Sequence, residues 1–231
     1  MTAAVRKIDL NGGFYTVAEA ARLLGMESRR SINRWLAPTR TGGAPVIIRD
    51  YPKAGREHEV SFFDLIEIKF VEHFRRVKIS LQSLRIAAAN AREELGVSHP
   101  FATGSVKFQT DRKQIFLDTA KKTGDRQLLN LMTKQVEMYE IIEGLFARDL
   151  EFSVDGFAAL WRPEPEIAPN VLVSPVYAFG RPVISDRRIP TVTLFESWVA
   201  NDQRSQEVAD WFDIDGGQVD EAVRFELRRL H

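Results

Sequence analysis

Apolar residues recur every three or four positions through the first third of the chain, the spacing typical of amphipathic helices. Over residues 15–36 this spacing is interrupted at Gly25, so the segment predicts two short helices joined by a turn. Thr16 and Glu19 have the spacing of a capping box at the start of the first helix. Ser28 can cap the second helix, whose outer face would carry Arg29, Arg30, Asn33 and Arg34.

This arrangement has the features of a helix-turn-helix unit. Small alanines in the first helix allow a close crossing, and the arginine-rich second helix could lie in the major groove of DNA. Arginine and asparagine side chains can contact phosphates or base edges there. A helical hairpin with an ordinary polar face is the alternative for this segment.

Two short β-rich runs follow, over residues 46–49 and 58–60, with a proline, a glycine and several charges between them. They predict a β-hairpin of the kind called a wing, with Arg49, Lys53 and Arg56 near its tip. Residues 14–56 hold eight Lys or Arg and three Asp or Glu. The resulting excess of positive charge favours contact with phosphate.

Two longer helices are predicted between residues 61 and 96. Ser61 and Asp64 have the spacing of a second capping box, Ser80 can start the next helix, and Gly96 can end it. The sequence SFFDLIEIKFVEHFRRVKISLQSLRIA, placed after a helix-turn-helix and a wing, resembles the MerR-type winged helix. The resemblance covers roughly residues 14–100 and implies a domain that binds double-stranded DNA as a homodimer. Residues 1–101 are therefore expected to form a MerR-like DNA-binding domain.

Residues 102–163 are expected to connect this domain to the rest of the chain. Alternation over residues 105–119 predicts a two-stranded β-ribbon, and residues 125–149 predict a long helix. The broad apolar stripe of that helix fits either a dimer contact or packing on its own chain. Residues 155–170, rich in proline and glutamate, are the candidate linker.

Residues 164–231 predict a small helical domain that follows short β segments. Its helices are expected to start near Thr193, Ser205 and Asp215, the last with Gln218 in a capping arrangement, and Val183 and Ile184 should form a strand. The whole chain is thus expected to be mainly α with short β elements: an N-terminal winged helix-turn-helix and a C-terminal, helix-turn-helix-like helical domain.

The C-terminal sequence resembles a small domain family of unknown function found in bacterial antitoxins. The resemblance covers about residues 171–230, including SQEVADWFDIDGGQVDEAV, and its motif positions are Gly180, Pro182, Ile184, Arg188, Ile189 and Pro190. The family usually has a glycine and a threonine where this chain has Asp186 and Arg187.

The order of an N-terminal MerR-like domain and this C-terminal domain resembles that of VapB-like type II antitoxins, which are encoded beside a PIN-like ribonuclease toxin. The resemblance implies that the chain neutralises such a toxin by direct binding and represses its own operon by binding promoter DNA.

Three arginines in the C-terminal motif are candidates for contact with that toxin. A planar guanidinium can pair with the clustered carboxylates that hold a nuclease's metal, so we consider Arg187 or Arg188, with Arg181 nearby, as the contact. In the alternative interpretation Arg188 pairs with an acidic helix cap of its own domain.

Composition limits the other possibilities. The chain has 231 residues, of which 44% are hydrophobic and 28% charged, as expected for a soluble protein of two small domains. No apolar run approaches the roughly 18 residues of a membrane span, so no membrane partner is expected. The absence of cysteine excludes thiolate metal sites and fits the cytoplasm. The four histidines never occur at ligand spacing, so neither a metal nor a cofactor is expected.

The zero net charge conceals an asymmetry along the chain. Residues 1–60 hold ten Lys or Arg against six Asp or Glu, whereas residues 151–231 hold eight against fourteen. This difference suggests that the two ends face different partners, although the acidic half also fits an ordinary solvated surface.

No catalytic constellation is evident, because the sequence lacks a nucleophile near a spaced His/Asp pair, a glycine-rich phosphate loop and an HExxH motif. The acidic residues of the tail fit solvated helix faces and caps better than a nuclease centre. We therefore expect no enzyme. The alternative function is a MerR-like transcriptional regulator with an apolar effector pocket within residues 150–231.

Overall fold

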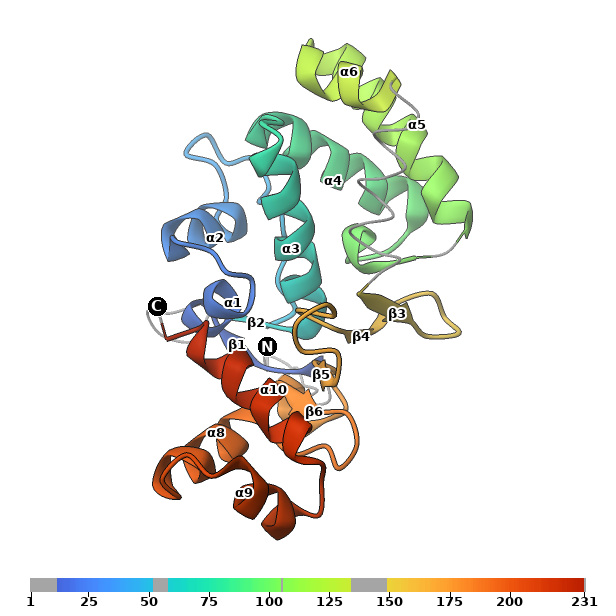
Figure 1. Cartoon of the computed structure of the whole chain (residues 1–231). Coiled ribbons are helices and arrows are strands. Elements are labelled where there is room, and N and C mark those ends of the chain that lie inside the picture. The colour runs from blue at the N-terminus through green and yellow to red at the C-terminus, as the bar shows by residue number, and fades with distance from the viewer. Residues whose placement is uncertain (1–11, 52–57, 105, 134–148, 231) are drawn as a thin grey trace, which may run out of the picture.

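The computed structural model describes residues 12–51, 58–104, 106–133 and 149–230 (Figure 1). These residues are mainly helical with short strands, as the sequence predicts, and the strands pair in two-stranded sheets. In Figure 1, α1 to α4 form the middle of the molecule, α5 and α6 lie above them, and α8 to α10 lie below. Among the described residues, no helix combines the length and the apolar character that a membrane span requires.

The first two helices form as expected. α1 spans Val17–Leu23 and α2 spans Arg29–Leu36. The Thr16 hydroxyl accepts a hydrogen bond from the Glu19 backbone N–H at 3.2 Å, and the Glu19 carboxylate accepts one from the Thr16 N–H at 2.8 Å. Gly25 adopts a left-handed φ of 59° in the turn, a conformation that a residue with a Cβ rarely adopts.

The expected strand pairing of the wing is wrong. β2 (Glu59–Val60) does form, but it pairs with β1 (Tyr15–Thr16), and residues 46–49 form no strand. Val46 and Ile47 are instead buried, and their backbone N–H groups donate to the Trp35 carbonyl at 3.0 and 3.3 Å. The last carbonyl groups of α2 have no partner within the helix and require hydrogen-bond donors. Residues 46 and 47 supply these donors, and residues 46–49 therefore do not pair with residues 58–60. The tip, residues 52–57, lies outside the described residues.

α3 (Phe62–Arg76) and α4 (Leu81–Leu95) also have the expected ends. The Ser61 and Asp64 capping box begins α3, Ser80 caps α4, and Gly96 ends it with a φ of 65°. Phe70 of α3 stacks on Phe101 with ring centroids 4.2 Å apart. Phe101 belongs to the short 3-10 helix η2 (Pro100–Ala102), so the aromatic contact fixes η2 against α3.

The expected β-ribbon over residues 105–119 is wrong, because this segment lies in one helix, α5 (Val106–Thr123). Ile115, Phe116, Thr119 and Ala120 are all buried, which is the spacing of one helical face rather than of a strand. Phe116 packs against the Phe74 ring at 5.4 Å. α6 (Arg126–Thr133) begins where the long helix of residues 125–149 was expected, but residues 134–148 and any dimer contact there lie outside the described residues.

Residues 155–170 are not a free linker. β4 (Ala158–Trp161) pairs antiparallel with β3 (Leu150–Phe152), and Trp161 is buried and bridges to Val173. This strand was overlooked in the sequence because its burial does not alternate: Ala158 and Trp161 are buried, and the two residues between them are half-buried.

The C-terminal unit has the expected order of elements. β5 (Val171–Leu172) pairs with β6 (Val183–Ile184), with the 3-10 helix η3 (Ala178–Gly180) between them. Three helices follow, α8 (Thr191–Ala200), α9 (Ser205–Phe212) and α10 (Gly216–Leu227).

The predicted helix starts are confirmed only in part. The Asp215 and Gln218 capping box is present at the start of α10. The cap expected at Thr193 is wrong: α8 begins at Thr191, directly after Pro190, whose fixed φ suits a helix start. Ser205 is the first residue of α9 rather than its cap.

Direct backbone contacts join the N-terminal and C-terminal units. The Tyr15 hydroxyl donates to the Gly180 carbonyl at 2.7 Å, and the Phe14 N–H donates to the Phe179 carbonyl at 3.1 Å. Gly180 has a φ of 88°, and an added Cβ would collide with the Tyr15 side chain. Glycine is therefore required where the two units meet.

A cluster of charges, buried except for the exposed Asp50, lies at the start of α3. His99 Nε2 lies 2.8 Å from an Asp50 oxygen, and His99 Nδ1 lies 3.8 Å from Asp64 Oδ1 and 3.6 Å from Glu67 Oε2. Arg92 Nη2 lies 3.9 Å from Glu67 Oε2 and also donates to the Val46 carbonyl. We call these five side chains the α3 charge cluster. It connects α3, α4, η2 and the loop that follows α2.

The α3 charge cluster changes the protonation of its members. Burial raises the pKa of Asp64 to about 7, although the Ser61 backbone N–H and the charge of His99 oppose this rise. Burial alone would lower the pKa of His99, but its contacts with Asp50 and Glu67 and the charge of Asp64 raise it to about 10. His99 is therefore an imidazolium at neutral pH.

A His99→Gln substitution tests this assignment. The folded-state pKa of His99 lies above its unfolded value of 6.5, so its stabilisation is complete below pH 6.5 and is lost as the pH rises through 10. We expect the wild-type free energy of unfolding to fall over this range by up to about 1.4 kcal/mol per pH unit. Urea denaturation at pH 6, 8 and 10 measures it. The variant should be less stable at pH 6 and should converge with the wild type by pH 10; parallel curves would contradict an imidazolium at this position.

Candidate functional site

The second helix presents the polar side chains expected of a DNA-contacting helix on one face. Arg29, Arg30, Asn33 and Arg34 are all exposed on α2, while Ile32, Trp35 and Leu36 are buried beneath them. Ser28 caps the helix by accepting from the Arg30 N–H at 3.3 Å. The structure therefore brings together these four candidates.

The other candidates for DNA contact are placed differently. Arg49 is half-buried, and its Nη1 has no hydrogen-bond partner within the described part of the chain. It does not occupy the exposed tip that the sequence suggested. Lys53 and Arg56 lie outside the described residues.

Sequence reasoning missed Arg85 of α4. Burial and the nearby charge of Arg34 lower the pKa of Arg85, which places the two guanidinium groups within electrostatic reach of one another. Arg85 extends the positive surface of α2 across to α4. No sequence signal connects residues fifty positions apart, so only the fold could identify this neighbour.

The arginines of the C-terminal motif are all exposed, but two of them already have partners. Arg187 forms an ion pair with the Asp213 carboxylate, and its Nε donates to the Asp213 carbonyl at 3.3 Å. Arg188 lies over the Tyr177 ring, 4.5 Å from its centroid. From the sequence, an ion pair between Arg188 and an acidic helix cap of its own domain was an alternative. Such a pair exists, but it is formed by Arg187, whose partner Asp213 is the C-cap of α9. Arg181 is exposed.

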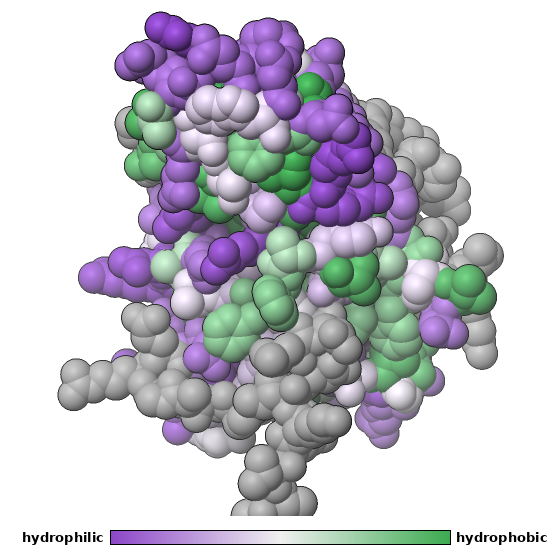
Figure 2. Space-filling view, turned by 90° about the horizontal axis from the view of Figure 1, so that it is seen from below, coloured by the Kyte–Doolittle hydropathy of each residue, from purple (hydrophilic) through white to green (hydrophobic). Residues whose placement is uncertain are grey.

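The C-terminal unit also exposes large apolar side chains. Val199 of α8 is 55% exposed and Trp211 of α9 is 62% exposed. The lower face of the molecule in Figure 2 shows apolar groups set among strongly polar ones. The α9 carboxylates Glu207 and Asp210 are also exposed. Apolar and charged groups side by side are typical of protein-binding surfaces.

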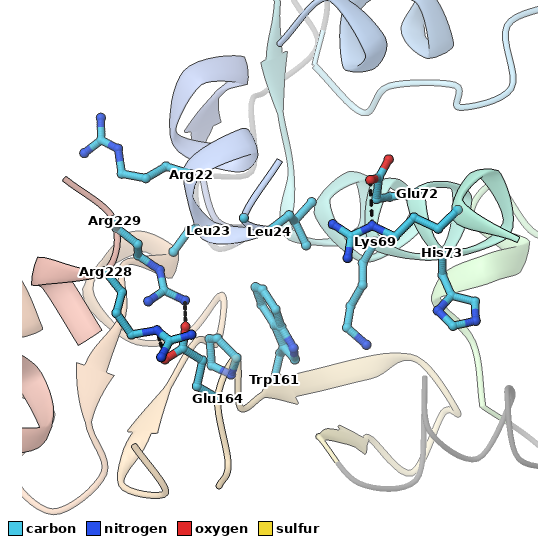
Figure 3. A pocket seen from close by; sticks show the side chains of 13 residues that line it. Arg22, Leu23, Leu24, Lys69, Glu72, His73, Trp161, Glu164, Arg228 and Arg229 are labelled. Atoms are coloured by element: carbon cyan, nitrogen blue, oxygen red, sulfur yellow. Dashed lines mark hydrogen bonds and ion pairs between the residues drawn. The ribbon is translucent and has the colours of Figure 1, made fainter. Parts of the chain in front are cut away.

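A pocket of about 390 Å³ lies between the end of α1, α3, β4 and the residues after α10. In the close-up of Figure 3, Arg228, Arg229 and Glu164 lie on one side, and Lys69, Glu72 and His73 lie on the other. Trp161 stands between the two sides, and Leu23 and Leu24 lie above it. This pocket differs from the apolar pocket expected within residues 150–231, because charged side chains line much of it and α1 and α3 contribute to it.

Ion pairs bind the pocket walls together. Arg229 Nη2 lies 3.0 Å from Glu164 Oε1, and Arg228 Nε lies 3.6 Å from Glu164 Oε2. Lys69 Nζ lies 3.1 Å from an oxygen of Asp149, which also accepts from the Trp161 indole N–H at 3.1 Å. Burial lowers the pKa of Lys69, which the charge of Asp149 partly offsets. Burial and the charges of Lys69 and Arg76 lower the pKa of His73, so its imidazole is neutral.

Within the described ranges, Asp50, Asp64 and His99 are the candidates for metal ligands, because their ligand atoms lie within 4.8 Å of one another. These residues belong to the α3 charge cluster. Without a metal, the raised pKa of His99 makes its ring a cation between these carboxylates, and Arg92 adds a second positive charge beside Glu67. The arrangement is that of a structural ionic network.

Comparisons with known proteins give a likeness in fold. No family model and no curated protein matches the chain. The X-ray crystal structure of Rv2018 from Mycobacterium tuberculosis superposes with a TM-score of 0.69 and 22% sequence identity, over 90% of this chain and 96% of that chain. The two chains thus share an architecture over most of their length.

Proposed function

We propose that this chain is a DNA-binding antitoxin, which represses its own operon by binding promoter DNA and neutralises a PIN-like ribonuclease by direct contact. The exposed polar face of α2 is the observation that carries the proposal. The helix has eight residues, and the diameter of an α-helix with its side chains, about 10–12 Å, matches the width of the major groove.

The environment of α2 supports a role in reading DNA. Its apolar side is fully engaged in the core, so the helix is held rigidly while its arginines remain free in solvent. The positive charge of Arg34 contributes to lowering the pKa of Arg85, after burial, and a bound phosphate would offset this repulsion. Asn33 and Arg30 are the side chains of this face best suited to base edges. A homodimer would present two such helices to successive turns of the duplex.

The C-terminal unit supports the second part of the proposal. The Arg187 and Asp213 side chains are 53% and 85% exposed, and an ion pair so exposed to water contributes little to stability. Arg187 can therefore exchange Asp213 for a carboxylate of a partner at small cost. Val199 and Trp211 add apolar area to the same unit.

A regulator that responds to a small effector is the second candidate function, and the pocket between α1, α3, β4 and the end of α10 favours it. Its volume of about 390 Å³ is in the range of small-molecule sites. In this case no stable protein partner would be expected.

Alanine substitution of Arg30 and of Arg34 tests the DNA contact. Each variant should bind DNA from upstream of its own gene with a free energy weaker by about 1–3 kcal/mol, and its salt dependence should be shallower by about one unit per lost phosphate contact. Fluorescence anisotropy across a salt series measures both.

Arg224→Ala is the matched control, because Arg224 is equally exposed but lies on α10. It should bind DNA as the wild type does. If all three variants bound DNA with the affinity of the wild type, α2 would not be the helix that contacts the major groove.

Co-expression with the product of the adjacent gene tests the antitoxin function. We expect a stable complex in which ribonuclease activity is suppressed. Reversing both charges with Arg187→Glu and Arg188→Glu should weaken the complex at least about tenfold, because a carboxylate would then face carboxylates of the toxin.

The Asp213→Asn variant distinguishes a contact of Arg187 with the toxin from its ion pair with Asp213 within the chain. The substitution removes the internal ion pair but keeps the guanidinium, so binding of the toxin should persist. Full binding by the charge-reversed variant would exclude these arginines from the interface, and the absence of any complex would refute the antitoxin function.

A further inference from the structure

The pocket beside α1 has more positive groups than its carboxylates neutralise. Within the described part of the chain, Arg22 has no ion pair, and Arg228 and Arg229 share the single carboxylate of Glu164. The remaining cations have their own partners, Lys69 with Asp149 and Arg76 with Glu72. The charge of Glu226 also acts on Arg229, so the five cations face four carboxylates and the pocket keeps an excess of about one positive charge, which attracts an anion.

Buried donors in the same lining lack partners. The Arg229 side chain is only 8% exposed, and its Nε has no hydrogen-bond partner among the described residues. Nε2 of the half-buried His73, on the opposite side of Trp161 in Figure 3, also has no hydrogen-bond partner there, and it is a donor in the Nε2–H tautomer of the neutral ring. Leaving buried polar groups unsatisfied costs free energy, so such groups indicate where acceptor oxygens would bind.

The pocket also offers apolar contact. Leu23, Leu24 and Trp161 lie between the two charged sides. A purely inorganic anion would leave this surface and most of the 390 Å³ unused. A ligand that combines an anionic group with an organic part would use all of these features.

We propose that this pocket binds a small organic phosphate. A phosphate group is negatively charged, in keeping with the positive excess of the lining, and accepts bidentate hydrogen bonds from guanidinium groups. Its organic part lies against Leu24 and Trp161. The proposal does not depend on the antitoxin function, because it concerns a pocket that the DNA-binding face of α2 does not include.

Isothermal titration calorimetry of the full chain tests the proposal, with AMP and glucose 6-phosphate as probes and adenosine, glucose and inorganic phosphate as their controls. We expect at least one organic phosphate to bind with a Kd below about 1 mM, and the controls to bind at least about tenfold more weakly. The double variant Arg22→Ala and Arg228→Ala should bind that probe at least about tenfold more weakly than the wild type. Arg224→Ala, on the neighbouring helix turn, should bind normally.

Thermal unfolding supplies a second measurement. The probe should raise the Tm of the wild type and leave that of the folded double variant unchanged. Failure of both organic phosphates to bind would overturn the proposal, as would equal binding of phosphate-free controls or undiminished binding by the double variant. Loss of DNA binding in the double variant without loss of probe binding would assign Arg22 and Arg228 to DNA instead.

Discussion

The orientation of α2 depends on charges buried beneath the first turn of α3. His99 is enclosed by Asp50, Asp64 and Glu67, and Arg92 joins Glu67 to the Val46 carbonyl. Val46 in turn donates its backbone N–H to the end of α2. A continuous series of contacts therefore runs from the core of α3 to the helix with the exposed arginines. Removing one member would leave other charges buried without partners, which is costly.

The rest of the structure separates two kinds of surface. α2 and Arg85 form a positive face on the N-terminal unit, whereas the C-terminal unit exposes carboxylates, Val199 and Trp211. The charge asymmetry along the sequence thus corresponds to different faces of the fold. Tyr15 and Gly180 hold the two units together, and the pocket lined by Arg228 and Trp161 lies where they meet. Under our proposals, DNA contacts α2, a protein partner contacts the C-terminal unit, and a small organic phosphate binds in the pocket between the two units.

Local signals predicted most of the helix ends, because capping depends on residues three positions apart, but the caps expected at Thr193 and Ser205 were wrong. The boxes of Thr16, Ser61 and Asp215 and the left-handed Gly96 are examples. Segments whose conformation depends on distant partners were predicted wrongly. Residues 46–49 were expected to be a strand, but Val46 and Ile47 donate hydrogen bonds to the end of α2. Residues 105–119 were expected to be a ribbon, but α5 begins at Val106 and packs Phe116 against Phe74. Arg85 and the pocket were missed because their neighbours are remote in sequence.

Hydrogen–deuterium exchange of the full chain, with and without double-stranded DNA from upstream of its own gene, tests the central claim most directly. Our account predicts that the amides of residues 28–36 exchange more slowly when DNA is bound, while those of α9 and α10 are unchanged. Protection confined to α9 and α10, or no protection in α2 under conditions where DNA is bound, would contradict it.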